Sequence, residues 1–386
     1  MQKQIEVTRS LDFDELRKLA DVEGPCITVS MQLQPAPNQS RMDFQRLKSA
    51  IRQAEYKLAE GWPDVPPSTV RELIESLHTL EDDSDAWRGG AGSLVIFRSP
   101  GVFRAFEVQH ELGDMVVVGD FFHVFPMLHA FQIAEQKFYV LALSKNNIRL
   151  LRCTRTGSEQ VPLPPGTPVR IEEWLNTRPA RSSPASDETF SGDGSTAGSF
   201  TSTTDRDKRD EHTTNFFHAV NKGVTEVLRG EPYPLVLCGV EHERLAYAAL
   251  NSYPHLNEEG VPGSPDSLKG GEMHARALEA VQDFFSQPAR KALDSWERIG
   301  GERALTSFPD IVKAAFEARV ATLFAREDAQ ALGSFDRSTM QMQVQGRQVD
   351  LVNAAALQTL AFGGEVFILS AGQVPGNAQM AAVLRY

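Results

Sequence analysis

The chain has few cysteines and no long apolar run. Its 386 residues include three cysteines, Cys26, Cys153 and Cys238, which lie far apart and without CxxC spacing. We therefore predict reduced cysteines in the core, with no disulfide framework and no metal ligands among them. No apolar run reaches the ~18 residues that a membrane helix requires, and residues 1–20 are too charged for a signal peptide. These absences predict a cytoplasmic protein that does not enter a membrane.

A surplus of basic residues is also missing. The formal net charge is −12 at pH 7, and no third of the chain is basic overall. Because a general RNA binder needs a field that attracts phosphates, this charge disfavours broad nucleic-acid affinity and leaves room only for a local basic footprint. The phosphate-binding GxxxxGKS/T motif and the dinucleotide-binding fingerprint are absent as well. Neither nucleotide chemistry nor a cofactor is predicted.

The order of apolar patterns predicts an α/β protein of three domains. Domain one, residues 1–130, contains an alternating segment at 26–33 that predicts a half-buried strand, and FFHVF at 121–125 that predicts another. Domain two, residues 131–269, opens with FYVLALSKNNIRLLRC, which predicts a β-hairpin. Domain three, residues 270–386, begins with an amphipathic helix.

A segment of low complexity interrupts domain two. Between Ser182 and Thr204 the composition falls mainly to Ser, Thr, Gly and Pro, with Phe190 and Phe200 as the only sizeable apolar residues. Such a segment cannot bury enough apolar surface to offset its ordering entropy, so we predict a mobile loop at 182–204. An unimportant insertion is the alternative, although loops of this length inside a domain are often functional.

The clearest local pattern lies in residues 350–386. Asp350 can cap a helix, and Gly363 with Gly364 supplies the backbone freedom to end it. The apolar run at 366–369 predicts a strand covered on both faces, and a Gly/Pro loop leads to a second strand at 381–384. The apolar side of the predicted helix consists of Leu351, Val352, Ala355, Ala356 and Leu360.

This order of helix, double glycine, strand, proline and strand resembles the C-terminal domain of the bacterial branch of the archaeo-eukaryotic peptide chain release factor family, which includes Pelota. Residues 305–335, with DIVKAAFEARVATLFA and ALGSFD, are similar to the start of that domain. FYVLALSKNNIRLLRC resembles the hairpin that opens the family's central domain, and PCITVSMQLQP resembles the family's first strand. The resemblance follows the family's order along most of the chain.

The resemblance implies a fold, a partner and a role. The implied fold has a central RNase H-like α/β domain and a C-terminal α/β sandwich similar to the kink-turn-binding ribosomal protein fold. The implied partner is the ribosome, through ribosomal RNA or tRNA, with a further protein partner at the C-terminal domain and no membrane. The implied role is termination, rescue of stalled ribosomes or control of translation, by a protein with a tRNA-like outline.

In the release factors that this chain resembles, the central loop carries Gly-Gly-Gln. Glycines let the backbone approach the peptidyl-tRNA ester, and the glutamine positions water while its backbone amide stabilises the oxyanion. Here the loop reads SGDGSTAGSF, and no glutamine occurs between Val161 and Val281. A non-catalytic factor is therefore expected. If a peptidyl-tRNA ester hydrolase remains, its weak candidates are Gly192, Asp193, Gly194, Ser195 and Gly198.

Two groups of cations are candidate RNA-binding residues. They are Arg41, Arg46, Lys48 and Arg52 in domain one, and Arg206, Lys208 and Arg209 after the loop of domain two. Cations at such positions can contact rRNA or tRNA phosphates. A solvated helix face is the alternative for both groups, and for the second group the interleaved aspartates favour it.

Other polar clusters predict no chemistry. Glu241, His242 and Glu243 resemble an acid–base cluster, but consecutive residues that enter a helix point in different directions, which predicts structural roles. The predicted strands at 138–144 and 148–153 contain no Asp or Glu, so metal-dependent nuclease chemistry is not expected. The histidines lack ligand spacing with a third partner, and no metal site is predicted.

Three functional hypotheses remain open. The first is a ribosome-associated factor that acts by occupying a ribosomal site. The second is an interaction scaffold that kept the architecture and lost ribosome binding, which the acidic charge favours. The third is a peptidyl-tRNA hydrolase that uses the Gly/Ser loop.

Overall fold

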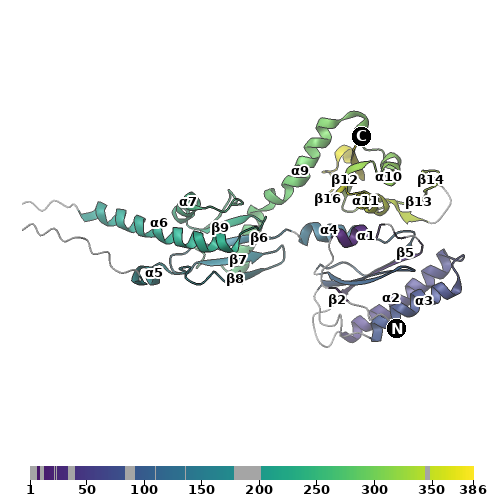
Figure 1. Cartoon of the computed structure of the whole chain (residues 1–386), viewed down its shortest axis with the longest axis horizontal. Coiled ribbons are helices and arrows are strands. Elements are labelled where there is room, and N and C mark those ends of the chain that lie inside the picture. The colour runs from purple at the N-terminus through teal and green to yellow at the C-terminus, as the bar shows by residue number, and fades with distance from the viewer. Residues whose placement is uncertain are drawn as a thin grey trace, which may run out of the picture. The chain divides into compact units, whose positions relative to one another are not determined.

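The computed structural model describes residues 7–8, 13–20, 22, 24–33, 40–82, 92–108, 110–134, 136–177, 201–343 and 348–386. Figure 1 shows the chain, which divides into two compact units. The first unit combines Met1–Ala134 with Pro288–Tyr386, and the second is the continuous segment Glu135–Gln287. Within the described ranges, no helix combines the length and apolar character needed to cross a bilayer.

The N-terminal part of the first unit is built on a five-stranded sheet with the order β1-β4-β3-β2-β5. The β1 strand runs parallel to β4, and the other neighbours are antiparallel. The strands are β1 (Val7–Thr8), β2 (Cys26–Leu33), β3 (Gly92–Ser99), β4 (Val102–Val108) and β5 (Met115–Gly119). The short helix α1 (Phe13–Lys18) precedes β2, and α4 (Phe125–Ala134) follows β5.

Two helices, α2 (Ser40–Gly61) and α3 (Pro67–Asp82), cover one face of this sheet. In Figure 1 they lie side by side next to β2. The apolar side chains of α2 recur at three- and four-residue steps, as an amphipathic helix requires. The structure buries these side chains completely: Leu47, Ile51, Ala54 and Leu58.

The C-terminal part of the first unit is built on a four-stranded sheet with the order β11-β17-β12-β16. Its strands are β11 (Ala304–Leu305), β12 (Val320–Arg326), β16 (Glu365–Leu369) and β17 (Met380–Leu384). Two helices, α10 (Phe308–Phe316) and α11 (Leu351–Ala361), pack on one face. Side chains of α9 (Gln282–Ile299), from Ala289 to Trp296, pack on the other face, which completes a sandwich.

Smaller elements complete this part of the first unit. A three-stranded sheet has the order β14-β13-β15. Its strands are β13 (Leu332–Asp336), β14 (Gln341–Gln343) and β15 (Val349–Asp350). Two short 3₁₀ helices, η2 (Gly301–Arg303) and η3 (Pro375–Asn377), precede β11 and β17.

The two segments of the first unit share one apolar core. Helix α11 is buried on all sides from Leu351 to Leu360 and packs against α10, α4 and α1. Asn353 lies inside this core: its Oδ1 accepts hydrogen bonds from Val124 N at 2.7 Å and Phe125 N at 3.0 Å. Its Nδ2 donates to Phe122 O at 2.9 Å. The Asn353 side chain therefore satisfies the free backbone amides at the start of α4 from the other end of the sequence.

The second unit is built on a five-stranded sheet with the order β10-β9-β6-β7-β8. Its strands are β6 (Phe138–Ala142), β7 (Arg149–Cys153), β8 (Ser158–Val161), β9 (Leu235–Gly239) and β10 (Val261–Pro262). The first three are antiparallel neighbours, whereas β9 runs parallel to β6 and β10 runs parallel to β9. The sheet is therefore mixed.

Helices cover both faces of this mixed sheet. One face is covered by α5 (Ile171–Thr177), α6 (Thr201–Val227) and α7 (Glu241–Leu250), which share an apolar cluster with it. The other face is covered by α8 (Gly270–Ala280), whose Met273 and Ala277 are buried against Phe138 and Val140. In Figure 1 the long helix α6 extends well beyond the strands of its unit.

Most of the predicted local elements are confirmed. The hairpin β6–β7 turns after residue 144, as expected. Asp350 caps α11 by accepting a hydrogen bond from Val352 N at 3.0 Å. The glycine pair follows the end of α11. Gly363 has a φ of 71°, a backbone angle that residues with a side chain rarely adopt. The expectation of an α/β chain with several sheets is also confirmed.

Three predictions in detail are wrong. The strand at 26–33 is buried on both faces, with Thr28 at 0% and Ser30 at 2% exposure, because the shared core covers the side that the alternation assigned to solvent. FFHVF is not a strand: residues 121–124 are irregular and Phe125 begins α4. In the predicted loop 182–204, residues 201–204 belong to α6, and residues 182–200 lie outside the described residues.

The division into three domains stays a prediction. Each of the predicted ranges 1–130, 131–269 and 270–386 contains a sheet of its own. The apolar core, however, joins the first and third of these ranges within one unit, and α8 packs in the second unit, which ends at Gln287. Each predicted range thus has a sheet of its own, whereas the apolar packing divides the chain into two units.

Candidate functional site

The carboxyl ends of β6, β9 and β10 meet at one edge of the second unit's sheet, because the three strands are parallel. We call this edge the carboxyl edge. The segments that follow the strands bring together Ser144, Lys145, Asp266 and the first turn of α7. Ligand sites are commonly built at this position in sheets with parallel strands. The carboxyl edge is therefore the candidate site of the second unit.

Hydrogen bonds join two of these segments. Ser144, which is 6% exposed, donates from Oγ to Asp266 Oδ2 at 2.6 Å and accepts from Asn146 N at 3.2 Å. Arg149 donates from Nη2 to Pro265 O at 3.3 Å. The turn between β6 and β7 is thus tied to the segment after β10, which gives the carboxyl edge a fixed geometry.

Glu243 is a buried carboxyl group in the first turn of α7, with 8% exposure. Burial raises the pKa of Glu243, Lys145 and His242 oppose that change, and the Asp266 carboxylate adds to it. Glu241 and His242, its neighbours in sequence, are exposed. The prediction that these three residues do not converge therefore agrees with their differing exposure, and only Glu243 belongs to the carboxyl edge.

Helices α5 and α6 flank the segment 178–200 in the sequence, and this segment itself lies outside the described residues. Before it, Ile171 N donates to Lys145 O at 2.9 Å, which fixes the start of α5. The ring of Trp174 in α5 meets the ring of Phe216 in α6 edge to face, with 6.0 Å between centroids. Two anchored helices therefore flank the segment that carries the loop candidates.

Helix α6 packs unusually closely against the chain that leads to α5. A Cβ atom added at Gly223 would lie 2.2 Å from Thr167 Oγ1 and 2.9 Å from Thr167 Cβ. Distances this short are excluded by van der Waals contact, so only glycine fits at this point of α6. Gly223 thus allows the segment around Thr167 to lie directly on the helix.

The N-terminal half of α6 projects past the carboxyl edge. From Phe217, which contacts Tyr247, to Asn221, which donates to Leu250 O, α6 runs in the same direction as α7. Because α7 begins at the carboxyl edge, the residues of α6 before Phe216 lead away from the sheet on that side, as Figure 1 shows. At 1.5 Å per residue, Thr201 lies roughly 20 Å along the helix from Phe216. The helix is a stalk for the segment 178–200.

The hydrogen bonds of Ser144 hold segments of the carboxyl edge in place. Its hydroxyl donates to the Asp266 carboxylate and accepts from the Asn146 amide, which fixes the turn after β6. No group of three or more His, Cys, Asp and Glu side chains in the described part of the chain is placed to hold a metal ion. The expectations of no metal and no cofactor remain predictions.

The candidate cations of α2 differ in their surroundings. Arg46 donates from Nε to Asp114 Oδ2 at 3.0 Å and from Nη1 to Gln32 O at 2.6 Å, and it also pairs with Asp43. Its guanidinium therefore ties α2 to the end of β2 and to the segment before β5. Lys48 and Arg52 are exposed. Arg41 lies in α2, and its side chain is outside the described residues.

The candidates of the second unit fall partly outside the described residues. Arg206, Lys208 and Arg209 lie in the projecting half of α6, but their side chains are not described. The loop candidates all lie outside the described residues: Gly192, Asp193, Gly194, Ser195 and Gly198. The two groups of cations belong to different units, one to α2 and the other to α6.

The cysteines are buried and free, as predicted. Burial raises the pKa of Cys26 and of Cys153 to about 12, and that of Cys238 to about 11. Because the thiolate is the reactive form, these cysteines are inert near neutral pH.

The sequence prediction missed Ser144, Lys145 and Asp266. Each lies just after or near the end of a strand, but only the parallel pairing of β6 with β9 and β10 brings them to one edge. The signal that could have found them is the order of a hairpin, a long helix, an apolar strand and another helix, which places β9 beside β6 in parallel.

A family model matches residues 137–319 of this chain, and its description is "Bacterial archaeo-eukaryotic release factor family 3". No curated protein matches the chain. Among solved structures, the chain is similar to a translation termination-like factor of S. cerevisiae involved in RNA quality control pathways, with 11% identity and a TM-score of 0.39. That alignment covers 76% of this chain and 73% of the other.

Two archaeal structures are also similar. Pelota, in a model of ribosome-bound archaeal Pelota and ABCE1, has 13% identity and a TM-score of 0.38, with 98% of this chain and 95% of that chain covered. An archaeal translation termination factor has 11% identity and a TM-score of 0.22, with 97% and 96% covered. The family match includes nearly all of the second unit, with its carboxyl edge, α5 and α6. Residues 137–319 are therefore similar to bacterial archaeo-eukaryotic release factor family 3.

Proposed function

We propose that the protein is a ribosome-associated factor in termination, rescue of stalled ribosomes or control of translation. The observation that carries this proposal is the family match over residues 137–319. It covers the carboxyl edge and the helices α5 and α6, which flank the segment 178–200 in the sequence. The partner in this proposal is the ribosome, through its RNA or a bound tRNA, and the site of action is the cytoplasm.

The proposed mechanism is occupancy rather than hydrolysis. The projecting half of α6 extends away from the sheet towards Thr201, which the segment 178–200 precedes in the sequence, and a projecting helix suits a probe that enters a confined site. That segment contains glycines but no glutamine, so the water-positioning side chain of the release factors is absent. The protein therefore blocks or senses a site on the ribosome without cleaving the peptidyl-tRNA ester.

The finer fold assignments belong to this proposal. The mixed sheet of the second unit, with helices on both faces, supports an RNase H-like central domain. The sandwich of the four-stranded sheet between α9 and the pair α10–α11 supports a C-terminal domain similar to the kink-turn-binding ribosomal protein fold. A protein partner at this sandwich is part of the same proposal.

The RNA contacts in this proposal come from two groups of cations. Arg206, Lys208 and Arg209 belong to the stalk, and Lys48 and Arg52 are exposed on α2. Arg46 contributes by fixing α2 rather than by touching RNA, since its donors are engaged with Asp114 and Gln32.

Co-sedimentation with ribosomes tests the proposal. We expect the protein in ribosomal fractions at low salt, enriched on stalled ribosomes, and lost progressively as salt rises. Removing the stalk cations together by Arg206→Ala, Lys208→Ala and Arg209→Ala should weaken association by about tenfold or more, since each phosphate contact adds affinity. The matched control removes Arg170, Lys222 and Arg229, three cations elsewhere in the second unit. Absence of the wild-type protein from all ribosomal fractions overturns the proposal.

Release of labelled peptide from ribosome-bound peptidyl-tRNA separates occupancy from hydrolysis. We expect no release above background. Release that disappears when residues 192–198 are deleted would establish the hydrolase and remove the occupancy mechanism.

An interaction scaffold without ribosome binding is the second candidate, because the net charge of −12 opposes phosphate binding. Purification from lysate distinguishes it from the first. Protein partners recovered without ribosomal RNA or ribosomal proteins favour the scaffold.

A further inference from the structure

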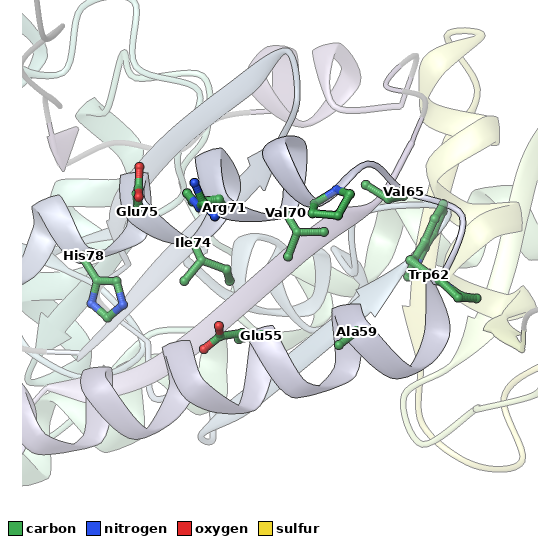
Figure 2. A pocket seen from close by; sticks show the side chains of 11 residues that line it. Glu55, Ala59, Trp62, Val65, Val70, Arg71, Ile74, Glu75 and His78 are labelled. Carbon is green, nitrogen blue, oxygen red and sulfur yellow. The ribbon is translucent and has the colours of Figure 1, made fainter.

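A groove runs between α2 and α3 in the first unit. Its volume is about 500 Å³, within the range of sites that bind small ligands or short segments. Figure 2 shows Glu55 and Ala59 on the side of α2, and Val70, Ile74 and His78 on the side of α3. Trp62 and Val65 lie at one end, in the turn that joins the two helices.

The floor of the groove is apolar and firmly supported. Trp62 is 7% exposed and Ile74 is 6% exposed, because both also belong to the core beneath α2 and α3. Pro63, Val65, Pro67 and Val70 complete the apolar lining. The floor is therefore a fixed surface that an apolar side chain can cover without any change in the protein.

The other end of the groove presents hydrogen-bond acceptors. In Figure 2, Glu55 reaches from α2 and His78 reaches from α3 into the gap between the helices. His78 Nδ1 lies 2.7 Å from Glu81 Oε1. In the tautomer that carries its proton on Nδ1, the ring donates to this carboxylate and offers Nε2 as an acceptor. Glu55 makes no hydrogen bond or ion pair to another described residue.

Charge at the rim favours a cation at this end. Arg71 and Glu75 stand four residues apart on α3, where opposite charges offset each other. Glu55 then contributes an uncompensated negative charge to the groove lining. An exposed carboxylate beside a histidine acceptor matches an ammonium or guanidinium group, which has several donors and no acceptor.

We propose that the groove between α2 and α3 binds an extended basic segment of a partner protein, with an apolar side chain on Trp62 and Ile74 and an Arg or Lys two residues away at Glu55 and His78. Alternate side chains of an extended segment point to the same side, so an apolar and a basic residue two positions apart can reach the floor and the acceptor end together. The proposal concerns the first unit and does not depend on ribosome binding.

Direct binding tests this site. The probe is a fluorescein-labelled hexapeptide with one leucine and one arginine two positions apart and serine elsewhere, measured by fluorescence anisotropy with the full-length protein. Replacing arginine by glutamate in the probe should weaken binding by about tenfold or more, since attraction becomes repulsion at Glu55. Replacing leucine by serine should weaken binding to a similar extent, because the floor loses its apolar partner.

Two variants connect the binding to the groove. Glu55→Gln keeps the shape and removes the charge, and it should weaken binding by about threefold to fivefold, as expected for an exposed ion pair. Ala59→Phe fills the groove from the exposed side of α2 and should reduce binding by about tenfold or more. The matched controls are Glu60→Gln and Ser49→Phe, exposed positions on α2 that do not line the groove. Both controls should bind like the wild type.

Several outcomes overturn the proposal. They are equal binding of the arginine and glutamate peptides, equal effects of groove and control variants, or no binding of any peptide. Binding of a labelled single-stranded RNA that Ala59→Phe abolishes would also overturn it, because the occupant would then be a nucleic acid. Circular dichroism of each variant confirms that the helices are retained.

Discussion

Two buried asparagines show how differently the two units are held together. Asn353 in α11 bonds to Phe122, Val124 and Phe125, which lie up to 231 residues away in the chain. Asn221 in α6 donates to Leu250 O at 3.0 Å and to Ser252 Oγ at 3.1 Å, at most 31 residues away. The first unit is therefore closed by contacts between the two ends of the sequence, and the second by contacts within one stretch.

Because of this difference, the long-range contacts that stabilise the first unit belong to a different unit from the candidate site. The shared core of the first unit depends on long-range packing, which costs more chain entropy to assemble than local packing does. The second unit, which carries the carboxyl edge and the stalk, is complete within residues 135–287. Substitutions in the two units should therefore affect different unfolding transitions.

The largest expected effect comes from the asparagine of the shared core. Asn353→Ala leaves Val124 N, Phe125 N and Phe122 O without their bonds in a buried site, and should destabilise the first unit by about 3 kcal/mol or more. Asn221→Ala should cost the second unit only about 1–2 kcal/mol, because Thr225 and Ser252 can still bond to each other.

Urea unfolding followed by tryptophan fluorescence measures both effects. Trp62 and Trp296 report on the first unit and Trp174 on the second, so Trp174→Phe separates the signals. If Asn353→Ala and Asn221→Ala lower the free energy of unfolding of their units equally, the proposed contrast between long-range and local contacts is wrong.

A steric test addresses the second unit. Gly223→Ala places a methyl group against Thr167 and should destabilise this unit by about 2 kcal/mol, the usual cost of overpacking. Adding Thr167→Gly should recover most of the loss, since it removes the Oγ1, the methyl group and the Cβ that an added Cβ at residue 223 would meet. The double-mutant cycle measures this coupling. Independent, additive effects of the two substitutions would contradict the close approach of α6.

A smaller effect distinguishes two arginines of α2. Arg46→Ala should destabilise the first unit by about 1 kcal/mol, because it removes the bonds to Asp114 and Gln32. Arg52→Ala should change the free energy of unfolding by less than about 0.5 kcal/mol, as exposed substitutions usually do. At 1 M NaCl the difference between the two losses of unfolding free energy should be smaller, because salt screens the ion pairs of Arg46. A larger loss for Arg52→Ala would show that the roles are reversed.

The smallest expected effect is a stabilisation, which comes from the substitution of Glu243 in the second unit. Burial raises the pKa of Glu243, so the folded second unit is penalised at pH values where the carboxyl group is ionised. The cost is present above the raised pKa and disappears as the pH falls through it towards the value of the unfolded chain. Glu243→Gln should therefore stabilise the second unit by about 1 kcal/mol or less at pH 7 and not at pH 4. Destabilisation at pH 7 would mean that the attraction of Lys145 and His242 for the Glu243 carboxylate outweighs burial.

Local patterns in the sequence predicted the elements well, and long-range packing explains the errors. The Asp350 cap, the glycines after α11 and the hairpin β6–β7 each depend on neighbouring residues, and all are present. The alternation in β2 predicted a solvent face, but α11 and its neighbours bury that face through residues far along the chain. Burial supplied by a distant segment leaves no periodic signal in the strand itself.

The candidate site was less accessible to prediction. Ser144, Lys145 and Asp266 meet because three strands run parallel, and pairing between strands cannot be read from any one of them. The groove between α2 and α3 arises from the spacing of two helices, which the pattern of either helix alone does not determine. The burial of Glu243 beside two exposed neighbours follows from its orientation at the start of α7.

The discontinuous origin of the first unit has a consequence for synthesis. When the N-terminal sheet has left the translation machinery, Phe97, Phe106 and Val95 on its inner face still lack α10 and α11, which are made last. The middle segment can meanwhile complete its own core. During synthesis the N-terminal sheet therefore exposes an apolar face while the second unit is already folded. In this period chaperone binding and aggregation compete with folding of the first unit.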